Sequence, residues 1–155
     1  MKKLHILSVA TLSLGMAGLC SGQTSSSTTT GASMAPYTEG AVWDLTMVRT
    51  KAGMDDDYIK NIANAWKATN EEAKKQGIIV DYKVLMGDAT NRDDYNILLM
   101  VQYKNMAAFD GLREKTDPIA RKLIGGEEQI RQGAVKRMEI RDILGTKTMR
   151  EITLK

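Results

Sequence analysis

Residues 78–103, IIVDYKVLMGDATNRDDYNILLMVQY, decide the fold because they contain two strand patterns joined by one polar turn. In Ile78–Met86 and in Tyr95–Tyr103, apolar side chains recur at every second position, which is the period of a strand. The connecting segment, Gly87–Asp94, is rich in Gly, Asn and Asp, which favour turns. We therefore predict an antiparallel hairpin in this part of the chain.

The segments before the hairpin predict one strand and one helix. Ala41–Arg49 alternates between apolar and polar side chains and is expected to form a strand. Asp55–Gln76 carries apolar residues at spacings of three and four, begins with carboxylates that can cap its first turn, and is followed by Gly77. This pattern is typical of a single amphipathic helix that ends at a glycine.

The segments after the hairpin predict two short helical pieces and a closing strand. Asn105 is expected to cap a short helix, and Pro118 to open a second piece that runs through Ile124 and resumes over Glu127–Gln132. Ala134–Leu144 is expected to be the fourth strand, with Thr148–Leu154 as a fifth strand or an extended tail. The order β-α-β-β-α-β predicts an α+β, ferredoxin-like domain, with helices on one face of a four-stranded antiparallel sheet.

The first residues have the layout of a secretory signal peptide. Lys2 and Lys3 precede an interrupted apolar stretch that leads to the small residues of Cys20–Gly22. We expect residues 1–22 to be a signal peptide, residues 23–36 to be a Ser/Thr-rich linker, and residues 37–155 to be a single domain. This layout predicts an exported protein, periplasmic or secreted, with no integral membrane segment after processing.

The cysteine in this leader raises the question of a lipid anchor. A bacterial lipobox places a small residue directly before the modified cysteine, whereas the bulky Leu19 precedes Cys20. We therefore favour cleavage after Gly22 over lipid anchoring at Cys20.

The composition excludes several kinds of chemistry from residues 23–155. The single His and the single Cys of the chain are His5 and Cys20, so the processed protein would have neither. This excludes disulfides, cysteine or serine–histidine nucleophilic machinery, histidine-ligated haem and ordinary zinc sites. Removal of Lys2 and Lys3 lowers the formal net charge from +3 to +1, which does not suit a general nucleic-acid binder.

The two faces of the sheet lead to a prediction of a homodimer. We expect the helix-covered side to hold Trp43, Leu45 and Met47, together with the alternate apolar residues of the hairpin. The opposite side would then mix apolar and charged residues, too apolar for a solvent face, and a second copy would cover it. The candidates for this dimer face are Asp44, Thr46, Leu98, Met100, Arg137, Glu139 and Arg141.

These elements resemble those of the dimeric α/β-barrel superfamily, which includes antibiotic-biosynthesis-monooxygenase-like and NIPSNAP-like families. The residues that carry the resemblance are VWDLTMVRTKAG (42–53), the helix that ends at Gly77, IIVDYKVLMG (78–87), YNILLMVQY (95–103) and NMAAFDGL (105–112). The resemblance implies a homodimer with a pocket between helices and sheet, in which relatives bind aromatic compounds, haem or polyketide-like substrates. Some relatives oxidise such substrates without metal or flavin, and the haem-dependent ones use a pocket histidine.

Aromatic residues supply the candidates for such a pocket. They are Trp43, Tyr58, Trp66, Tyr82, Tyr103 and Phe109, and the alternative is that they only fill the core. We expect no cofactor and no metal, because Asp55–Asp57 is typical of a helix start and lacks the spacing of a calcium loop. Asn61, Asn64 and Asn70 are expected to be exposed helix residues.

The sequence leaves three hypotheses for function open. The first is a noncatalytic homodimeric module that binds a small apolar ligand or another protein. The second is a cofactor-independent, monooxygenase-like enzyme for an aromatic or polyketide-like substrate, which would use Trp66, Tyr58 and neighbouring Asn or Asp residues. The third is a structural envelope protein. No paired acid and base stands out, so we lean towards a protein that is not an enzyme.

Overall fold

The structure is a computed structural model that describes residues 35–155. The predicted signal peptide, Cys20 and the linker up to residue 34 lie outside the described residues. The described segment contains a four-stranded sheet and two hydrophobic clusters. Within residues 35–155, no helix has the length and apolar character needed to cross a membrane.

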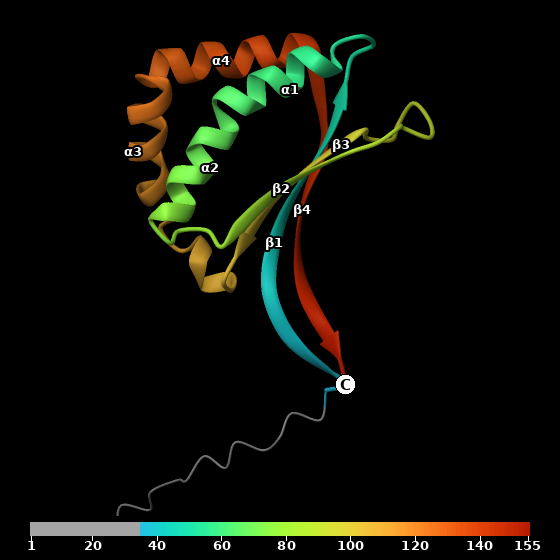
Figure 1. Cartoon of the computed structure of the whole chain (residues 1–155), viewed down its shortest axis with the longest axis vertical. Coiled ribbons are helices and arrows are strands. Elements are labelled where there is room, and N and C mark those ends of the chain that lie inside the picture. Colours follow the sequence, from blue (N-terminus) through green and yellow to red (C-terminus); the bar gives the residue numbers. More distant parts are fainter. Residues whose placement is uncertain (1–34) are drawn as a thin grey trace, which may run out of the picture. The chain divides into compact units, whose positions relative to one another are not determined.

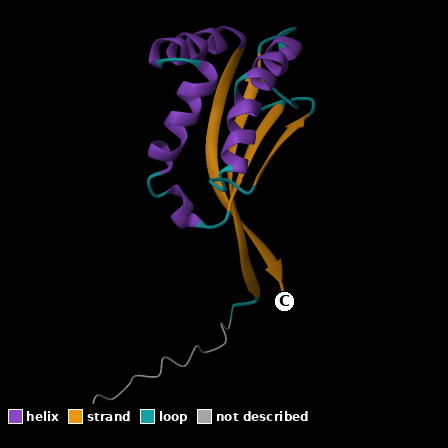
Figure 2. Ribbon diagram, turned by 60° about the vertical axis from the view of Figure 1, so that its left-hand side comes forward, coloured by secondary structure: helices purple, strands orange, loops and turns teal. Residues whose placement is uncertain are grey.

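Four antiparallel strands form one sheet in the order β2-β3-β1-β4. The strands are β1 (Tyr37–Thr50), β2 (Asp81–Met86), β3 (Ile97–Tyr103) and β4 (Arg141–Leu154). The helices all lie on one side of this sheet (Figure 1, Figure 2). With the element order β-α-β-β-α-β, this topology confirms the prediction of a ferredoxin-like fold.

Five helical elements connect these strands. They are α1 (Asp55–Asn64), α2 (Trp66–Lys75), the short 3-10 helix η1 (Met106–Phe109), α3 (Leu112–Ile124) and α4 (Glu127–Ile140). The predicted helix over 55–76 is therefore two helices, and Gly77 follows α2 with a φ of 69°, as the prediction of a glycine stop requires. Pro118 lies inside α3 and does not open it.

The strand predicted over Ala134–Leu144 is wrong, because α4 continues to Ile140 and leads directly into β4. The partly buried residues of α4 recur at helical spacing, at Ile130, Gly133, Ala134, Arg137 and Ile140. Two of these residues are small and one is charged, so only the two isoleucines give the inner side of α4 an apolar character in the sequence. The predicted fifth strand is also wrong, because Thr148–Leu154 belongs to β4 and pairs with the start of β1 in the same chain.

The helix-covered side of the sheet holds the larger core cluster. Val48 pairs with Ile97, and both are fully buried against Tyr58 and Ile62 of α1. Because side chains alternate along a strand, Val42, Asp44 and Thr46 share this side with Val48. The prediction that Trp43, Leu45 and Met47 face the helices is therefore wrong. The opposite side, termed the helix-free face, carries Trp43, Leu45, Met47, Lys83, Leu85, Leu98, Met100 and Gln102.

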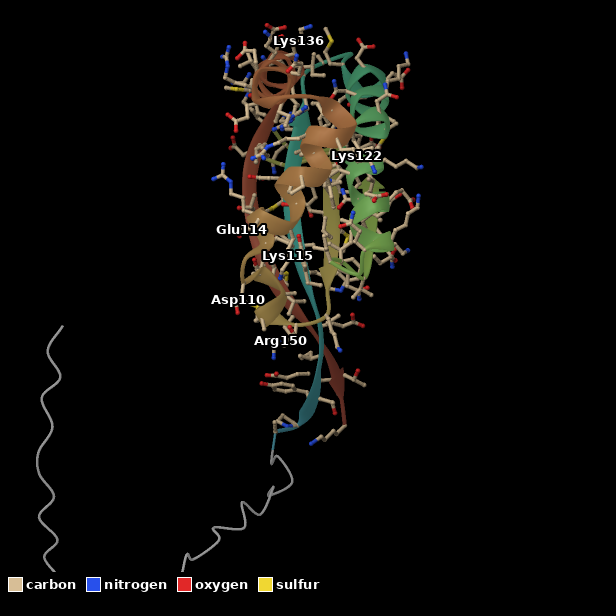
Figure 3. The ribbon with its side chains drawn as sticks, turned by 90° about the vertical axis from the view of Figure 1, so that its left-hand side faces the viewer. Asp110, Glu114, Lys115, Lys122, Lys136 and Arg150 are labelled. Carbon is tan, nitrogen blue, oxygen red and sulfur yellow. The ribbon has the colours of Figure 1, made fainter. Side chains whose placement is uncertain are left out.

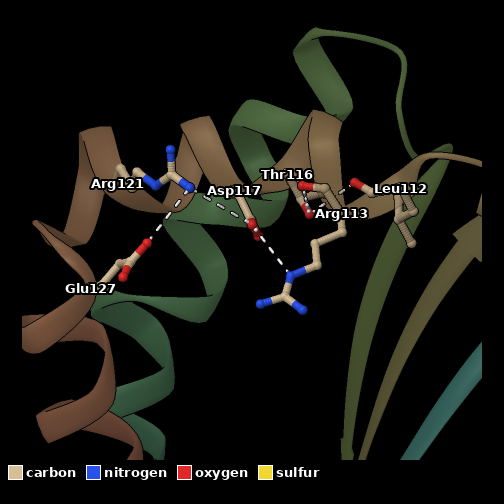
Figure 4. Close-up of polar contacts among 6 residues, drawn as sticks. All are labelled: Leu112, Arg113, Thr116, Asp117, Arg121 and Glu127. Atoms are coloured by element: carbon tan, nitrogen blue, oxygen red, sulfur yellow. Dashed lines mark hydrogen bonds and ion pairs between the residues drawn. The ribbon is translucent and has the colours of Figure 1, made fainter.

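A second cluster fixes the other end of the helical layer. Ile119 of α3 packs with Ala73 of α2, with Ile79 and with Tyr103 of β3. The corner between α3 and α4 is held by ion pairs, in which Arg121 lies 4.0 Å from Asp117 and 3.9 Å from Glu127 (Figure 4). Charged residues such as Glu114, Lys115 and Lys122 occupy the outward side of α3 (Figure 3).

The start of β1 and the end of β4 form a two-stranded ribbon that extends past the other two strands (Figure 1). Residues 37–41 pair only with residues of β4, because the pairing with β3 begins at Val42. Within the ribbon, Glu39 forms an ion pair with Arg150. Leu154 is 76% exposed and Ile152 is 48% exposed, so the ribbon presents apolar side chains to solvent.

Candidate functional site

A cavity of about 320 Å³ lies between the helices and the covered side of the sheet. Thr46 of β1 and Leu99 of β3, which are register partners, supply the lining on the sheet side. The helices supply a mostly apolar wall, together with two arginines from the end of α4. This volume lies at the lower end of the range for small-molecule sites in proteins.

The break between α1 and α2 places Ala65, Trp66 and Asn70 along this cavity. The Thr69 hydroxyl donates to the Ala65 carbonyl at 2.9 Å, and the Asn70 amide donates to the Trp66 carbonyl at 2.8 Å. Side chains that bond to the carbonyl four residues earlier bend helices, which gives a physical reason for the break. The sequence analysis expected Asn70 to be exposed, but it is buried because its amide is used inside the bend.

Arg137 and Arg141 line the cavity from the last turn of α4 and the residue that follows this helix. The Arg141 guanidinium lies 5.7 Å from the centre of the Tyr58 ring, which is a cation–π contact. Burial raises the pKa of the Tyr58 hydroxyl, and the charges of Arg141 and Arg137 act in the opposite direction. The three side chains therefore form one electrostatically coupled group at the cavity.

Asn61 supplies a polar atom that the sequence analysis missed. It lines the cavity, and its Oδ1 is buried without a hydrogen-bond partner in the structure. The Nε of Arg141 is also buried without a hydrogen-bond partner. Unsatisfied buried polar atoms are uncommon in folded proteins, so two of them at one cavity mark this region as incomplete without a further polar group.

The predicted pocket aromatics fall in four different places. Tyr58 and Trp66 line the cavity. Tyr103 and Phe109 pack against each other with ring centres 4.5 Å apart in the second core cluster, as the core alternative expected. Trp43 lies on the helix-free face, where the Lys83 ammonium is 5.4 Å from its ring centre and its indole N–H donates to Glu151 at 3.2 Å.

Tyr82 belongs to a second hollow of about 190 Å³, which it lines together with Trp66 and other residues of α1, α2 and β2. The Trp66 and Tyr82 rings meet edge to face with centres 5.2 Å apart. The Tyr82 hydroxyl donates to Glu71, and this hydrogen bond raises the pKa of Tyr82 to about 12. Trp66 therefore separates the cavity from a more apolar hollow beside the β2 edge.

The residues predicted to form a dimer face do not lie on one side of the sheet. Leu98 and Met100 lie on the helix-free face. Asp44, Thr46 and Arg141 lie on the helix-covered side of the sheet, and Arg137 and Glu139 belong to α4, so the prediction that these five residues share the helix-free face is wrong, and their role in a dimer stays a prediction. The sequence analysis placed Arg137 and Arg141 on one side of a strand, whereas in the structure Arg137 lies in the last turn of α4 and Arg141 is the extended residue that follows this helix.

The aspartates at the start of α1 do not gather into a metal site. Asp55 accepts hydrogen bonds from the Thr50 hydroxyl and from the Asn96 amide, the latter at 2.8 Å, so it ties α1 to the sheet and does not cap its own helix. Asp57 instead faces Lys60 at 4.0 Å on the surface. Within residues 35–155, no group of three His, Cys, Asp or Glu side chains is placed to hold a metal ion.

Comparisons with known proteins describe the architecture more than the chemistry. No family model matches the sequence, and a search of curated proteins gives no match. Among solved structures, the chain is similar to HapK from Hahella chejuensis, with 12% identity, a TM-score of 0.48, and coverage of 71% of this chain and 91% of that one. It is also similar to a NIPSNAP family protein of unknown function from Agrobacterium tumefaciens, with 13% identity, a TM-score of 0.44, and coverage of 75% and 90%.

A third similar structure is a dimeric ferredoxin-like protein from an uncultured marine organism. It shares 11% identity with this chain at a TM-score of 0.44, and the match covers 76% of this chain and 90% of that one. The ferredoxin-like fold of this chain is established by its own strand order and register.

Proposed function

We propose that the protein is an exported, homodimeric module that binds a small, largely apolar ligand. The observation that carries this proposal is the cavity of about 320 Å³ between the helix break and the sheet. Its lining combines an apolar wall with a few convergent polar groups, which is the usual composition of a ligand site. Tyr58 and Trp66 provide the aromatic surface, and Arg137, Arg141 and Asn61 provide the polar groups.

The homodimer is supported by the helix-free face. Two of its polar groups already have partners within the chain, because the Lys83 ammonium lies over the Trp43 ring and the Trp43 indole donates to Glu151. What remains is an apolar strip of Leu45, Met47, Leu98 and Met100. A second copy offers the same strip, which makes the two surfaces self-complementary about a two-fold axis.

The ribbon of β1 and β4 supports the same arrangement. A two-stranded ribbon in water is at best marginally stable, and Ile152 and Leu154 expose apolar surface on this one. Contact with a second copy would bury these side chains. We therefore propose that both the helix-free face and the ribbon take part in the dimer.

Export is proposed from the leader alone. The test is to express the full chain in a bacterial host, separate cytoplasm, periplasm and medium, and measure the mass of the mature protein. A mass that begins at Gln23 supports cleavage after Gly22. A lipid-modified mass that begins at Cys20 contradicts that cleavage and shows a membrane anchor, and an uncut cytoplasmic chain contradicts export.

One specific observation keeps an oxygenase in consideration. Tyr58, Trp66, Asn61 and Asn70 all line the same cavity, so an aromatic substrate bound there would contact both ring and amide groups. The alternative proposal is therefore a cofactor-independent, monooxygenase-like enzyme that acts on an aromatic or polyketide-like substrate. The arginine charges would stabilise the anion of a phenolic substrate, which is the form that reacts most readily with oxygen.

A single set of measurements separates the two proposals. The chain from Gln23 is purified and examined by native mass spectrometry for a retained small molecule, and its oxygen uptake is then followed with dithranol and with polyphenols. Of the two tryptophans, only Trp66 lines the cavity. Oxygen uptake therefore supports the enzyme if Trp66→Phe abolishes it and Trp43→Phe leaves it intact. A retained ligand without uptake supports the binding module, and an empty protein that takes up neither oxygen nor ligands contradicts both.

A further inference from the structure

Within residues 35–155, the two arginines at the cavity have no carboxylate partner. Their apolar surroundings distinguish them from Arg49, which donates to backbone carbonyls, and from the exposed Arg92, which also form no ion pair there. Arg113, Arg121, Arg131 and Arg150 each form an ion pair with a carboxylate. Among the described residues, neither Arg137 nor Arg141 forms an ion pair. The lining of the cavity contains no Asp or Glu that could balance their charges.

Burial and mutual repulsion make the positive charges of Arg137 and Arg141 unfavourable in the empty cavity. Burial lowers the pKa of the Arg137 guanidinium, and the nearby positive charge of Arg141 lowers this pKa further. Two like charges beside an apolar wall, with the Nε of Arg141 buried and unpaired, destabilise the empty cavity. The negative end of the α4 dipole offsets only part of this cost, because its effect is confined to the last turn.

An anion in the cavity would remove that cost. A carboxylate or sulfonate accepts several charge-assisted hydrogen bonds from guanidinium groups, which are planar and present their donors as a fork. The buried Oδ1 of Asn61 requires a donor, which a hydroxyl on the same ligand can supply. The remaining lining, from Ile62, Ala65, Trp66 and Leu99, is suited to an apolar body.

We propose that the cavity binds an apolar organic acid as its anion, with the acidic group held by Arg137 and Arg141 and the apolar body against Trp66 and Leu99. This inference rests on the proposed ligand cavity and specifies the class of its ligand.

The test uses two dyes with the same aromatic body. One is 8-anilinonaphthalene-1-sulfonate, which carries an anionic group, and the other is N-phenyl-1-naphthylamine, which carries none. Binding of each dye to the chain from Gln23 is measured by fluorescence titration. We expect the anionic dye to bind about tenfold more tightly than the neutral dye.

Variants locate the effect. Arg137→Gln and Arg141→Gln should each weaken binding of the anionic dye about tenfold and change binding of the neutral dye by less than about twofold. Arg141→Lys retains the charge and should recover part of the preference. The control is Arg113→Gln, which removes an exposed, paired arginine on α3 and should change neither affinity (Figure 4). Circular dichroism establishes that each variant is folded.

A cavity-filling variant, Ala65→Phe, distinguishes failure of this inference from failure of the proposed function. If Ala65→Phe blocks both dyes but the anionic dye has no advantage and the Arg→Gln variants bind normally, the cavity binds ligands and the anion preference is wrong. If neither dye responds to Ala65→Phe, the dyes bind elsewhere or not at all, and both the ligand cavity and its anion preference are wrong. Loss of only the anionic dye in both Arg→Gln variants supports the inference.

Discussion

In an ordinary single domain, the covered side of a sheet is apolar and the side that faces solvent is polar. In this protein, the helix-covered side contains polar groups and the helix-free face contains large apolar ones. The covered side holds a fully buried pair, Val48 and Ile97, but also the polar Asp44 and Thr46 and a cavity with two unpaired arginines. The helix-free face presents Leu45, Met47, Leu98 and Met100 without any layer above them. Polar groups thus occupy part of the interior, and large apolar groups occupy part of the surface.

This contrast shows that each side of the sheet has groups without a matching partner in the chain, and that the two sides need different partners. The covered side lacks a polar partner for its cavity, and an anionic ligand would supply it. The helix-free face lacks apolar cover, and a second copy would supply it. Substitutions of neighbouring residues can test the two faces separately, because adjacent positions on a strand point to opposite sides of the sheet.

The largest expected effect comes from Ile97→Ala compared with its neighbour Leu98→Ala. Ile97 is fully buried on the covered side, so its truncation leaves a cavity in the larger core cluster and should lower the free energy of unfolding by about 3 kcal/mol. Leu98 lies on the helix-free face, so Leu98→Ala should cost little in a dilute, monomeric sample. Urea unfolding at two protein concentrations measures both effects.

The concentration dependence is the decisive part of this comparison. If the helix-free face is a dimer interface, the loss of stability in Leu98→Ala should grow as protein concentration rises, whereas the loss in Ile97→Ala should not. A Leu98→Ala variant that loses the same stability at every concentration would contradict a dimer through this face.

The second expected effect is on assembly itself. Met100→Asp places a carboxylate in the middle of the apolar strip, where burial would require desolvation of its charge, and should weaken dimerisation at least 100-fold. The matched control is Met138→Asp on α4, where the original methionine is already 65% exposed, and this variant should dimerise normally. Sedimentation equilibrium measures both. A wild-type protein that is monomeric at micromolar concentration, or a Met100→Asp dimer, would contradict the proposal.

The contrast between the faces also explains what the sequence could predict. The hairpin over 78–103 has apolar residues at every second position on either side of a polar turn, so its two strands were predicted correctly, although β2 begins at Asp81 and β3 at Ile97. In β1, apolar residues occur on both sides, with Val42 and Val48 on one and Trp43 on the other. The alternation of Trp43, Leu45 and Met47 suggested that Trp43 lies inside, but Val42 and Val48 are the fully buried residues of this strand.

The cavity was partly predictable for a similar reason. Tyr58 and Trp66 were chosen correctly as residues that line a hollow, because they lie on the inner side of a strongly amphipathic helix. Arg137 and Arg141 were assigned to a dimer face and not to the cavity, because their segment was predicted to be a strand. The inner side of α4 combines small and charged residues at the cavity with Ile140, which packs against the larger core cluster, and this mixture gives a weak helical pattern.

The smallest expected effect concerns Asp44, a carboxyl on the covered side. Burial raises the pKa of Asp44 above its usual value of 3.8, and a hydrogen bond from Thr148 offsets part of this shift. The folded state therefore binds a proton more readily than the unfolded state, and its stability decreases as the pH rises from 3.8 through the folded pKa. Asp44→Asn removes this loss and should raise the free energy of unfolding at pH 7 by no more than about 0.5 kcal/mol, because solvent still screens a half-exposed carboxyl.

A carboxyl with the opposite shift serves as the control for Asp44. Asp94 accepts hydrogen bonds from the backbone and side chain of Thr90, which lower its pKa, so it stabilises the fold above its unfolded pKa and loses this contribution as the pH falls through the folded pKa. Asp94→Asn should therefore destabilise the protein at pH 7, whereas Asp44→Asn should stabilise it. Urea unfolding between pH 3 and pH 7 measures the two slopes. If Asp44→Asn also destabilised the protein at pH 7, the Asp44 carboxylate would have a favourable partner on the covered side. The absence of a balancing charge would then apply only to Arg137 and Arg141 at the cavity.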